Sequence, residues 1–252
     1  MINVIAGTLI FSLLFLQSPS AGRKSERESD GFVGPVKKAV EEWSPVSGYS
    51  DPPDSRFQSR VQVYDKDGRL IQYSIYSGVF SNDENREHYT YDPEGDRTTR
   101  FEFIQGKNSP PPPPPPMMPP GTVVKGPPKT TFKYDAQGMR IEKANLRANG
   151  ELIYKTTYKY DEKGRLQEMQ VIHANGPRYR WIYTYEGEKR FPETEDSFEG
   201  DSNTPKATTA YTDYELNSQG DWTKRKQTRK ETPGRTTVSI RYRNIEYYPA
   251  KN

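Results

Sequence analysis

The stretch YDEKGRL at residues 160–166 decides the fold, because the chain repeats it. Related phrases are YDKDGRL at residues 64–70, YDPEGDR at residues 91–97 and YDAQGMR at residues 134–140. In each phrase the Asp side chain can hydrogen-bond its own backbone and the Gly tolerates a positive φ, which suits a type I turn followed by a left-handed residue. The phrase therefore predicts a tight hairpin corner with a G1 bulge.

The corners recur with a regular period. The tyrosines that open the units are spaced 27, 43, 26, 25 and 29 residues apart, and the long interval contains an insertion. A second corner reads ANG at residues 148–150 and 174–176, and Asn-Gly predicts a type I′ turn because both residues tolerate positive φ. These corners give a structural turn role to six glycines: Gly68, Gly95, Gly138, Gly150, Gly164 and Gly176.

The segments between the corners have strand composition. RLIQYSIY at residues 69–76 and ELIYKTTYKY at residues 151–160 alternate with a period near two. About fourteen such strands run from Val36 to Tyr248. Strands joined by tight turns are antiparallel neighbours, so the expected fold is all-β, a long antiparallel β-meander of repeated hairpins in an open, twisted or curled sheet.

An aromatic ladder follows from the same spacing, because residues two apart on a strand share a face. Its members are Tyr89, Tyr91, Phe132, Tyr134, Tyr158, Tyr160, Tyr183 and Tyr185. The ladder is either the core of the sheet or a platform for a ligand. We favour the core, because so polar a chain has few other apolar groups to bury.

Composition limits what the chain can do. Only 31% of the residues are hydrophobic and 28% are charged, at a net charge of +3, which fits thin amphipathic β-structure rather than a large core. The chain has no cysteine, so disulfides and thiolate nucleophiles are excluded. Its two histidines, His88 and His173, lack ligand-type spacing, and no catalytic motif occurs. We therefore expect no enzyme activity, no cofactor and no metal site.

The N-terminus indicates export. An apolar run at residues 2–16 precedes QSPSAG, which predicts a signal helix at residues 1–21, cleaved near Ser20–Gly22. An uncleaved anchor is the alternative. We expect a flexible tether at residues 22–34 and a location in the periplasm, at the outer surface or outside the cell.

One β-sheet domain should fill residues 35–252. A Pro-rich loop at residues 108–128 interrupts it, and the run Pro110–Pro116 should form polyproline II. The loop is either an expanded hairpin tip, which we favour, or a docking rod for a partner.

On these residues the chain resembles the YD repeats of the RHS family of bacterial exported proteins, over residues 57–248. The closing GDWTKR at residues 220–225 is also similar to the last unit of small members. The resemblance implies an exported β-sheet protein built of YD units. It does not imply toxin delivery, because the chain has too few units to enclose a toxin.

The expected function is therefore an exported, non-catalytic protein of the cell envelope or extracellular space with a structural or interaction role. The alternative is a carbohydrate- or cell-wall-binding module that uses the aromatic ladder, and a third possibility is a β-rich polysaccharide hydrolase. Expected partners are a glycan, a cell-wall polymer or another envelope protein. The basic residues at 224–243 are interpreted as a solvated face, so we expect no nucleic acid, and no membrane span after signal removal.

Overall fold

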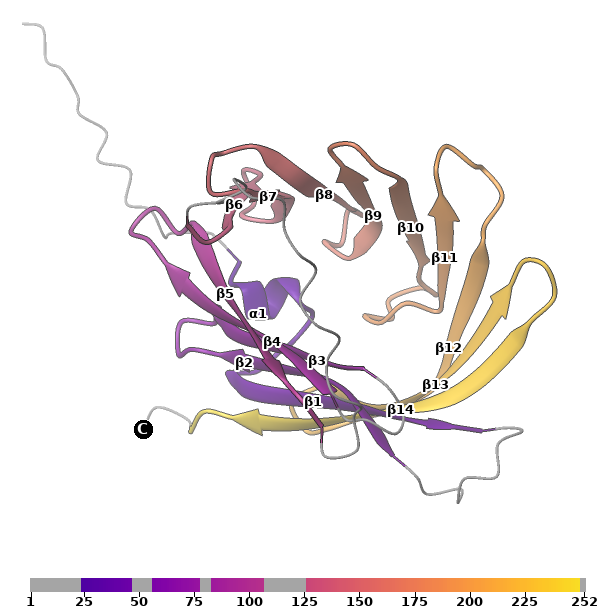
Figure 1. Ribbon diagram of the computed structural model, residues 1–252. Coiled ribbons are helices and arrows are strands. Elements are labelled where there is room, and N and C mark those ends of the chain that lie inside the picture. The colour runs from indigo at the N-terminus through magenta and orange to yellow at the C-terminus, as the bar shows by residue number, and fades with distance from the viewer. Residues whose placement is uncertain (1–23, 47–55, 78–82, 107–125, 250–252) are drawn as a thin grey trace, which may run out of the picture.

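The computed structural model describes residues 24–46, 56–77, 83–106 and 126–249 (Figure 1). These residues hold one short helix and fourteen strands. None of their helices is long and apolar enough to cross a membrane. The elements are α1 (Glu26–Ser29), β1 (Val36–Pro45), β2 (Phe57–Tyr64), β3 (Leu70–Ser77), β4 (Asp83–Tyr91), β5 (Arg97–Ile104), β6 (Lys129–Tyr134), β7 (Arg140–Leu146), β8 (Leu152–Tyr160), β9 (Leu166–His173), β10 (Arg178–Thr184), β11 (Thr194–Glu199), β12 (Ala207–Leu216), β13 (Trp222–Glu231) and β14 (Thr236–Tyr247).

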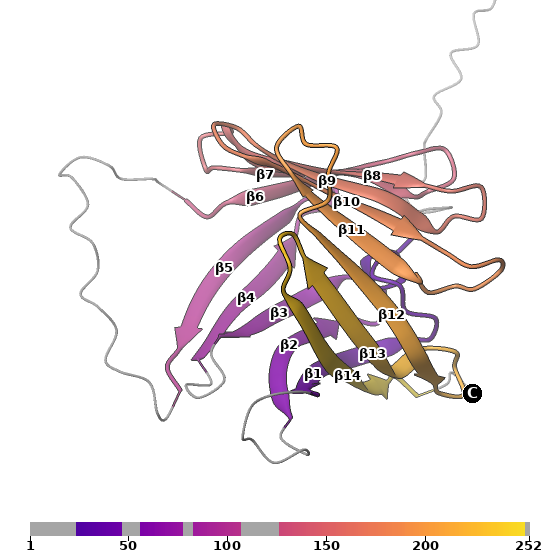
Figure 2. The same cartoon turned by 90° about the vertical axis from the view of Figure 1, so that its right-hand side faces the viewer.

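The strands form one closed barrel in which each pairs antiparallel with its neighbours in the chain (Figures 1 and 2). β1 pairs with β2 on one side and with β14 on the other, from Val36 opposite Tyr247 to Pro45 opposite Ser239. The all-β class and the antiparallel connectivity agree with the sequence prediction, whereas the predicted open sheet is wrong. The signal helix expected at residues 1–21 lies outside the described residues and finds no support in the structure.

The repeated corners explain why the sheet curls. At the first corner the Gly68 N–H donates to the Asp65 carbonyl (3.0 Å) and the Asp65 N–H to the Arg69 carbonyl (2.9 Å). The register shifts beside this corner, between Val63 and Tyr64, and beside the corners at Tyr134 and Tyr160. A bulge bends its strand and increases the local twist, so repeated bulges curl a sheet in one direction. The β1–β14 ladder then removes both free edges.

The two ANG corners differ from the sequence prediction. Gly150 has φ +86°, but Asn149 is not among the residues with positive φ, and neither is Gly176. Three residues lie between Arg147 and Glu151, whose backbone groups bond at 2.8 Å. A three-residue loop takes a type I turn followed by a left-handed residue, so the expected type I′ turn is wrong. The other predicted corner glycines with positive φ are Gly68, Gly95, Gly138 and Gly164.

The tyrosines of the repeated phrase have a second structural task. The Tyr91 hydroxyl donates to the Leu70 carbonyl (2.6 Å), a residue at the start of the preceding hairpin's second strand. Equivalent bonds run from Tyr160 to the Arg140 carbonyl, from Tyr185 to Leu166 and from Tyr214 to Pro192, at 2.8–2.9 Å. Each of these tyrosines thus ties one hairpin to the preceding one. The Tyr248 hydroxyl donates instead to the carbonyl of Tyr64 at the end of β2 (2.8 Å), across the closure of the barrel.

One seam of the barrel is short. β5 and β6 pair only through Arg97 with Thr130 and Thr98 with Lys129. Pro127 and Pro128 come directly before β6, and proline has no N–H to donate to a ladder. Of the Pro-rich loop predicted at residues 108–128, only residues 126–128 are described, and they lead directly into β6 at this seam.

The polar segment before β1 crosses one end of the barrel. We call residues 24–34 the N-terminal cap. Its backbone N–H groups donate to the corners of three hairpins: Lys24 to the Gly138 carbonyl (2.9 Å), Arg27 to the Gly68 carbonyl (3.0 Å) and Val33 to the Asp221 carboxylate (2.8 Å). Figure 1 shows α1 inside the ring of strands. The sequence predicts a flexible tether at residues 22–34, and in the structure residues 24–34 make these contacts with the hairpin corners.

The hydrophobic core lies between the cap and the wall. Its buried members are Phe32, Val36, Ala39, Tyr64, Leu70 and Tyr89. A barrel of eight strands is just filled by its side chains, whereas one of 16 to 18 strands encloses a channel. With fourteen strands, the cap fills one end, and the rest of the interior is the place to look for a site.

Candidate functional site

The contacts of the cap identify the inner face of the wall. Tyr64, Arg97 and Arg140 all bond or pair with cap residues, so they face inward. Directly paired residues on neighbouring strands share a face, and so do residues two apart on one strand. We call the face so defined the inner wall and the opposite one the outer wall.

The predicted aromatic ladder lies on the inner wall, and arginine guanidinium groups lie over several of its rings. The Arg97 guanidinium lies 3.8 Å from the ring centre of Tyr89 and 5.5 Å from that of Phe132. Arg140 lies 4.9 Å from the ring of Tyr158. Burial raises the pKa of the Tyr89 and Tyr183 hydroxyls, as expected inside a wall. Together with the hydroxyl ties of Tyr91, Tyr160 and Tyr185, these contacts make the ladder part of the framework.

The carboxylates of the cap are satisfied by the wall. Glu26 accepts from the Arg97 guanidinium (3.0 Å) and from the Leu70 N–H (2.9 Å), and it shares the single proton of the Tyr91 hydroxyl with the Leu70 carbonyl. Asp30 accepts from the Tyr64 hydroxyl (2.7 Å), while burial and then this carboxylate raise the pKa of Tyr64 well above its usual value. The cap is thus joined to the wall by charged hydrogen bonds, which are stronger than neutral ones.

A first group of inner-wall cations surrounds Glu41. The carboxylate accepts from Arg60 (2.6 Å) and from Arg243 (3.4 Å). Burial opposes ionisation of Glu41, but Arg60, Arg243 and Arg225 outweigh it and lower its pKa to about 2. Arg243 stacks on Trp222 at 3.8 Å, so this group helps to build the wall.

A second group of inner-wall cations has unpaired donors. Arg97 Nε, Arg140 Nε and Asn145 Nδ2 are buried without a hydrogen-bond partner. Lys143 has no hydrogen bond or ion pair within the described part of the chain. Burial, and then the positive charges of Arg97 and Arg140, lower the pKa of Lys143 to about 8. Thr130 pairs with both Arg97 and Asn145 across β5, β6 and β7, so these residues occupy one patch.

Large apolar side chains are exposed on the inner wall away from the cap. Phe101 is 65% exposed, Phe103 is 53% exposed and Ile75 is 44% exposed. Phe103 and Ile75 both pair with Asn85, so the three residues are neighbours across β3, β4 and β5. We call them the inner apolar patch. Sequence reasoning missed it, although the alternation in RFEFI at residues 100–104 signals one apolar face.

Further aromatic residues line the inner wall on β8, β9 and β10. The ring of His173 lies 5.4 Å from that of Tyr154 and 6.1 Å from that of Tyr179, which in turn lies 6.2 Å from Trp181. None of these rings belongs to the predicted ladder. His173 therefore has an aromatic rather than a metal-binding environment.

The outer wall carries charged pairs that cross between strands. Lys133 on β6 pairs with Glu142 on β7 (2.8 Å), and Lys159 on β8 pairs with Glu168 on β9 (3.0 Å). His88 on β4 lies 2.9 Å from the Glu102 carboxylate on β5. Exposed pairs of this kind contribute about 0–1 kcal/mol each, so they add little to the stability of the fold.

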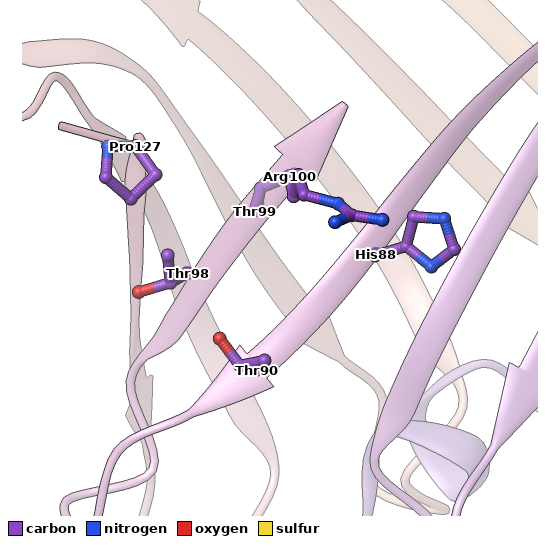
Figure 3. A pocket seen from close by; sticks show the side chains of 6 residues that line it. All are labelled: His88, Thr90, Thr98, Thr99, Arg100 and Pro127. Atoms are coloured by element: carbon purple, nitrogen blue, oxygen red, sulfur yellow. The ribbon is translucent and has the colours of Figure 1, made fainter. Parts of the chain in front are cut away.

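A shallow hollow of about 390 Å³ opens at the β5–β6 seam (Figure 3). His88 and Thr90 from β4, Thr98, Thr99 and Arg100 from β5, and Pro127 line it. The hollow exists because the two strands pair only at one end, and His88 is engaged by Glu102. Among the described residues, no group of His, Cys, Asp or Glu side chains is arranged to hold a metal ion.

Fold and interior together define a closed antiparallel barrel, capped at one end, with cationic and apolar patches on its inner wall. The model of a family described as "Uncharacterised protein" matches residues 121–216, which is less than half of the chain. No curated protein matches.

Three solved structures are similar at low identity. A porin-like protein from Bacteroides uniformis has 14% identity and a TM-score of 0.48, covering 85% of this chain and 99% of that chain. A porin-like protein from Bacteroides vulgatus has 12% identity and a TM-score of 0.35 at the same coverage. A DUF1329 family protein from Desulfovibrio piger has 10% identity and a TM-score of 0.28, covering 89% and 90%. Likenesses this weak carry no functional argument.

The expected membership of the YD-repeat family is wrong. Neither the matching family nor the similar structures are described as YD-repeat proteins. The phrase Tyr-Asp-x-x-Gly instead marks hairpin corners of the barrel that share the same backbone turn bonds. Three of these corners also have a register shift, and Tyr91 and Tyr160 add a hydroxyl bond to the preceding hairpin.

Proposed function

We propose that the chain is an exported, non-catalytic binding protein whose barrel interior holds an elongated, largely apolar small molecule. The observation that carries this proposal is the inner apolar patch of Ile75, Phe101 and Phe103. Fully burying one such side chain stabilises a protein by about 1.5–3 kcal/mol. Only 31% of the residues are hydrophobic, yet three large apolar side chains stay exposed on one concave surface and do not contribute this stabilisation. Such exposed apolar side chains in a concave surface are typical of a ligand site.

The charges of the outer wall support a barrel that works in water. Pairs such as Lys133–Glu142 and Lys159–Glu168 lie where a barrel embedded in a bilayer has an apolar band. The exposed side chains of Ile75, Phe101 and Phe103 lie on the inner wall instead. This arrangement suits a container for an apolar molecule surrounded by solvent.

The N-terminal cap makes the two ends of the barrel different. Its bonds to the corners at Gly68, Gly138 and Asp221 obstruct one end of the barrel. The ligand is therefore expected to enter from the end that lies away from the cap, where the inner apolar patch is found. Export remains part of the proposal and rests on the apolar run at residues 2–16.

Carbohydrate binding on the aromatic ladder is a weaker candidate. Sugar stacking needs a free ring face, but the rings of Tyr89 and Tyr158 face guanidinium groups at 3.8 and 4.9 Å. A glycan would have to displace Arg97 or Arg140, whose charges bond or pair with the cap.

A titration with N-phenyl-1-naphthylamine, a neutral apolar fluorescent probe, tests the proposal. Wild-type protein should bind it saturably, and Phe101→Ser combined with Phe103→Ser should weaken binding at least about tenfold, which is 1.4 kcal/mol. Ile182→Ser is the matched control, because Ile182 pairs with Glu168 and Asp196 on the outer wall. Absence of saturable binding, or equal affinity in the double variant, would refute the proposed function.

A further inference from the structure

We infer that the interior also holds an anionic head group, received by the unpaired donors of Arg97, Arg140, Lys143 and Asn145. The inference rests on the proposed function and narrows its ligand to an amphiphile with a carboxylate or similar oxyanion at one end. We call these four residues the donor patch.

Three side chains of the donor patch have a buried nitrogen donor without an acceptor. The Nε–H groups of Arg97 and Arg140 are buried and unpaired, and so is the amide nitrogen of Asn145. The amide oxygen of Asn145 is already used, because it accepts from the Thr130 hydroxyl at 2.9 Å. Buried donors without partners are rare and costly in folded proteins. Three of them beside the Lys143 ammonium therefore indicate that an acceptor from outside the chain completes the site.

The cap does not supply that acceptor. Glu26 binds a terminal nitrogen of Arg97 at 3.0 Å, and Asp30 lies 3.8 Å from a terminal nitrogen of Arg140. These contacts leave both Nε–H groups and Lys143 unused. The charges that act most on Lys143 are those of two cations, Arg97 and Arg140, and two carboxylates, Glu26 and Asp30, so together with Lys143 this group has one positive charge in excess. One monovalent anion would balance the patch.

The state of Lys143 agrees with an incomplete site. Burial first, and then repulsion from Arg97 and Arg140, lower its pKa to about 8, although Glu26 and Asp30 act in the opposite direction. A bound anion would offset that repulsion and favour the ammonium form.

The donor patch and the inner apolar patch are continuous. Arg97, Thr99, Phe101 and Phe103 are successive inner-wall residues of β5. At about 3.4 Å per residue, the Cα atoms of Arg97 and Phe101 are separated by roughly 14 Å along the strand. One strand thus contacts both ends of an elongated ligand, with the acidic head beside the cap and the apolar chain directed away from it.

Calorimetric titration with dodecanoate and dodecanol at pH 7, below their aggregation limits, tests the inference. The two probes share a chain and differ in the head group. Wild-type protein should bind dodecanoate at least about tenfold more tightly than dodecanol, and acetate alone only weakly. Lys143→Met should remove the preference for dodecanoate while dodecanol binding persists.

Two control variants keep the test decisive. Lys133→Met removes a lysine of the adjacent strand that pairs with Glu142 on the outer wall, so the preference should be unchanged. Lys143→Arg should retain the preference for dodecanoate, and it replaces Lys143→Met if that variant does not fold.

The outcomes separate the inference from the proposed function. Equal affinity for dodecanoate and dodecanol in wild-type protein, or an unchanged preference in Lys143→Met, would show that the donor patch does not bind the anionic head group. The proposal that the barrel binds an apolar molecule would then still stand. If acetate bound as tightly as dodecanoate, the apolar chain would contribute nothing to affinity, and the inference that the ligand is an amphiphile would be wrong. Failure of both long-chain probes to bind would refute the proposed function itself and the inference with it.

Discussion

Alanine substitutions at two corner glycines can measure what the N-terminal cap contributes to stability. Gly68 and Gly150 have nearly the same φ, +81° and +86°, so Ala is strained similarly at both positions. That strain costs about 1–2 kcal/mol per residue. The surroundings differ: a Cβ at Gly150 meets nothing within 4 Å, whereas a Cβ at Gly68 would lie 2.8 Å from the Cβ of Ser25 in the cap.

The clash with Ser25 must move the cap, because a Cβ atom is not the flexible end of a side chain. The bond from the Arg27 N–H to the Gly68 carbonyl (3.0 Å) is then lost or lengthened. A buried hydrogen bond of this kind contributes about 1 kcal/mol net. Gly68→Ala should therefore destabilise by about 2–3 kcal/mol and Gly150→Ala by about 1–2 kcal/mol.

Urea unfolding followed by tyrosine and tryptophan fluorescence measures the difference between the two variants. Amide hydrogen exchange at Arg27 should also accelerate in Gly68→Ala and not in Gly150→Ala. Gly164→Ala is an internal control, since its Cβ would come no closer than 3.9 Å to Lys24 Nζ. Equal destabilisation at Gly68 and Gly150, with unchanged exchange, would mean that residues 24–34 do not brace the barrel.

The wall and the loop give three further predictions. Tyr160→Phe removes the donor to the Arg140 carbonyl and should cost about 1 kcal/mol in urea unfolding, so a neutral result would contradict the tyrosine tie. Because the folded-state pKa of Lys143, about 8, lies below its unfolded value, the unfolded chain binds more protons between these pKa values. The free energy of unfolding should therefore rise above pH 8, and Lys143→Met should reduce that rise, whereas an identical pH profile would argue against a partly buried, repelled ammonium. Deleting Pro110–Pro120 should leave the thermal midpoint nearly unchanged, and a large drop would mean that the segment packs on the barrel.

The repeated phrase made the hairpins predictable but not the closure of the sheet. Asp-x-x-Gly indicated each corner because the turn is built from neighbouring residues. Pairing of β1 with β14 joins Val36 to Tyr247 and depends on curvature summed over every bulge, for which no local pattern exists. For the same reason the inside of the barrel, and any site within it, could not be identified from the sequence.

The contacts of the aromatic ladder could not be predicted from the sequence either. The sequence predicted that its rings share one face of the sheet, but the side chains that contact these rings come from other units of the repeat. Arg69 lies 5.4 Å from the ring of Tyr91, and Arg165 lies 4.4 Å from that of Tyr185, so an arginine of one phrase covers a tyrosine of the next. The cap was interpreted as a tether because it is polar, although its carboxylates pair with buried wall residues.

The central claim is that the sheet closes on itself and so creates an interior. The chain has no cysteine, so Val40→Cys combined with Asn244→Cys gives a clean test. These residues are direct partners in the β1–β14 ladder, where opposed Cα atoms lie about 4.5–5.5 Å apart, within the range of a disulfide. In an open meander of fourteen strands they would lie on opposite edges, roughly 60 Å apart at about 4.8 Å per strand. Mild oxidation of the double variant should give a monomer in which mass spectrometry finds an intramolecular disulfide between the two introduced thiols, whereas free thiols or exclusively intermolecular links would contradict the closed barrel.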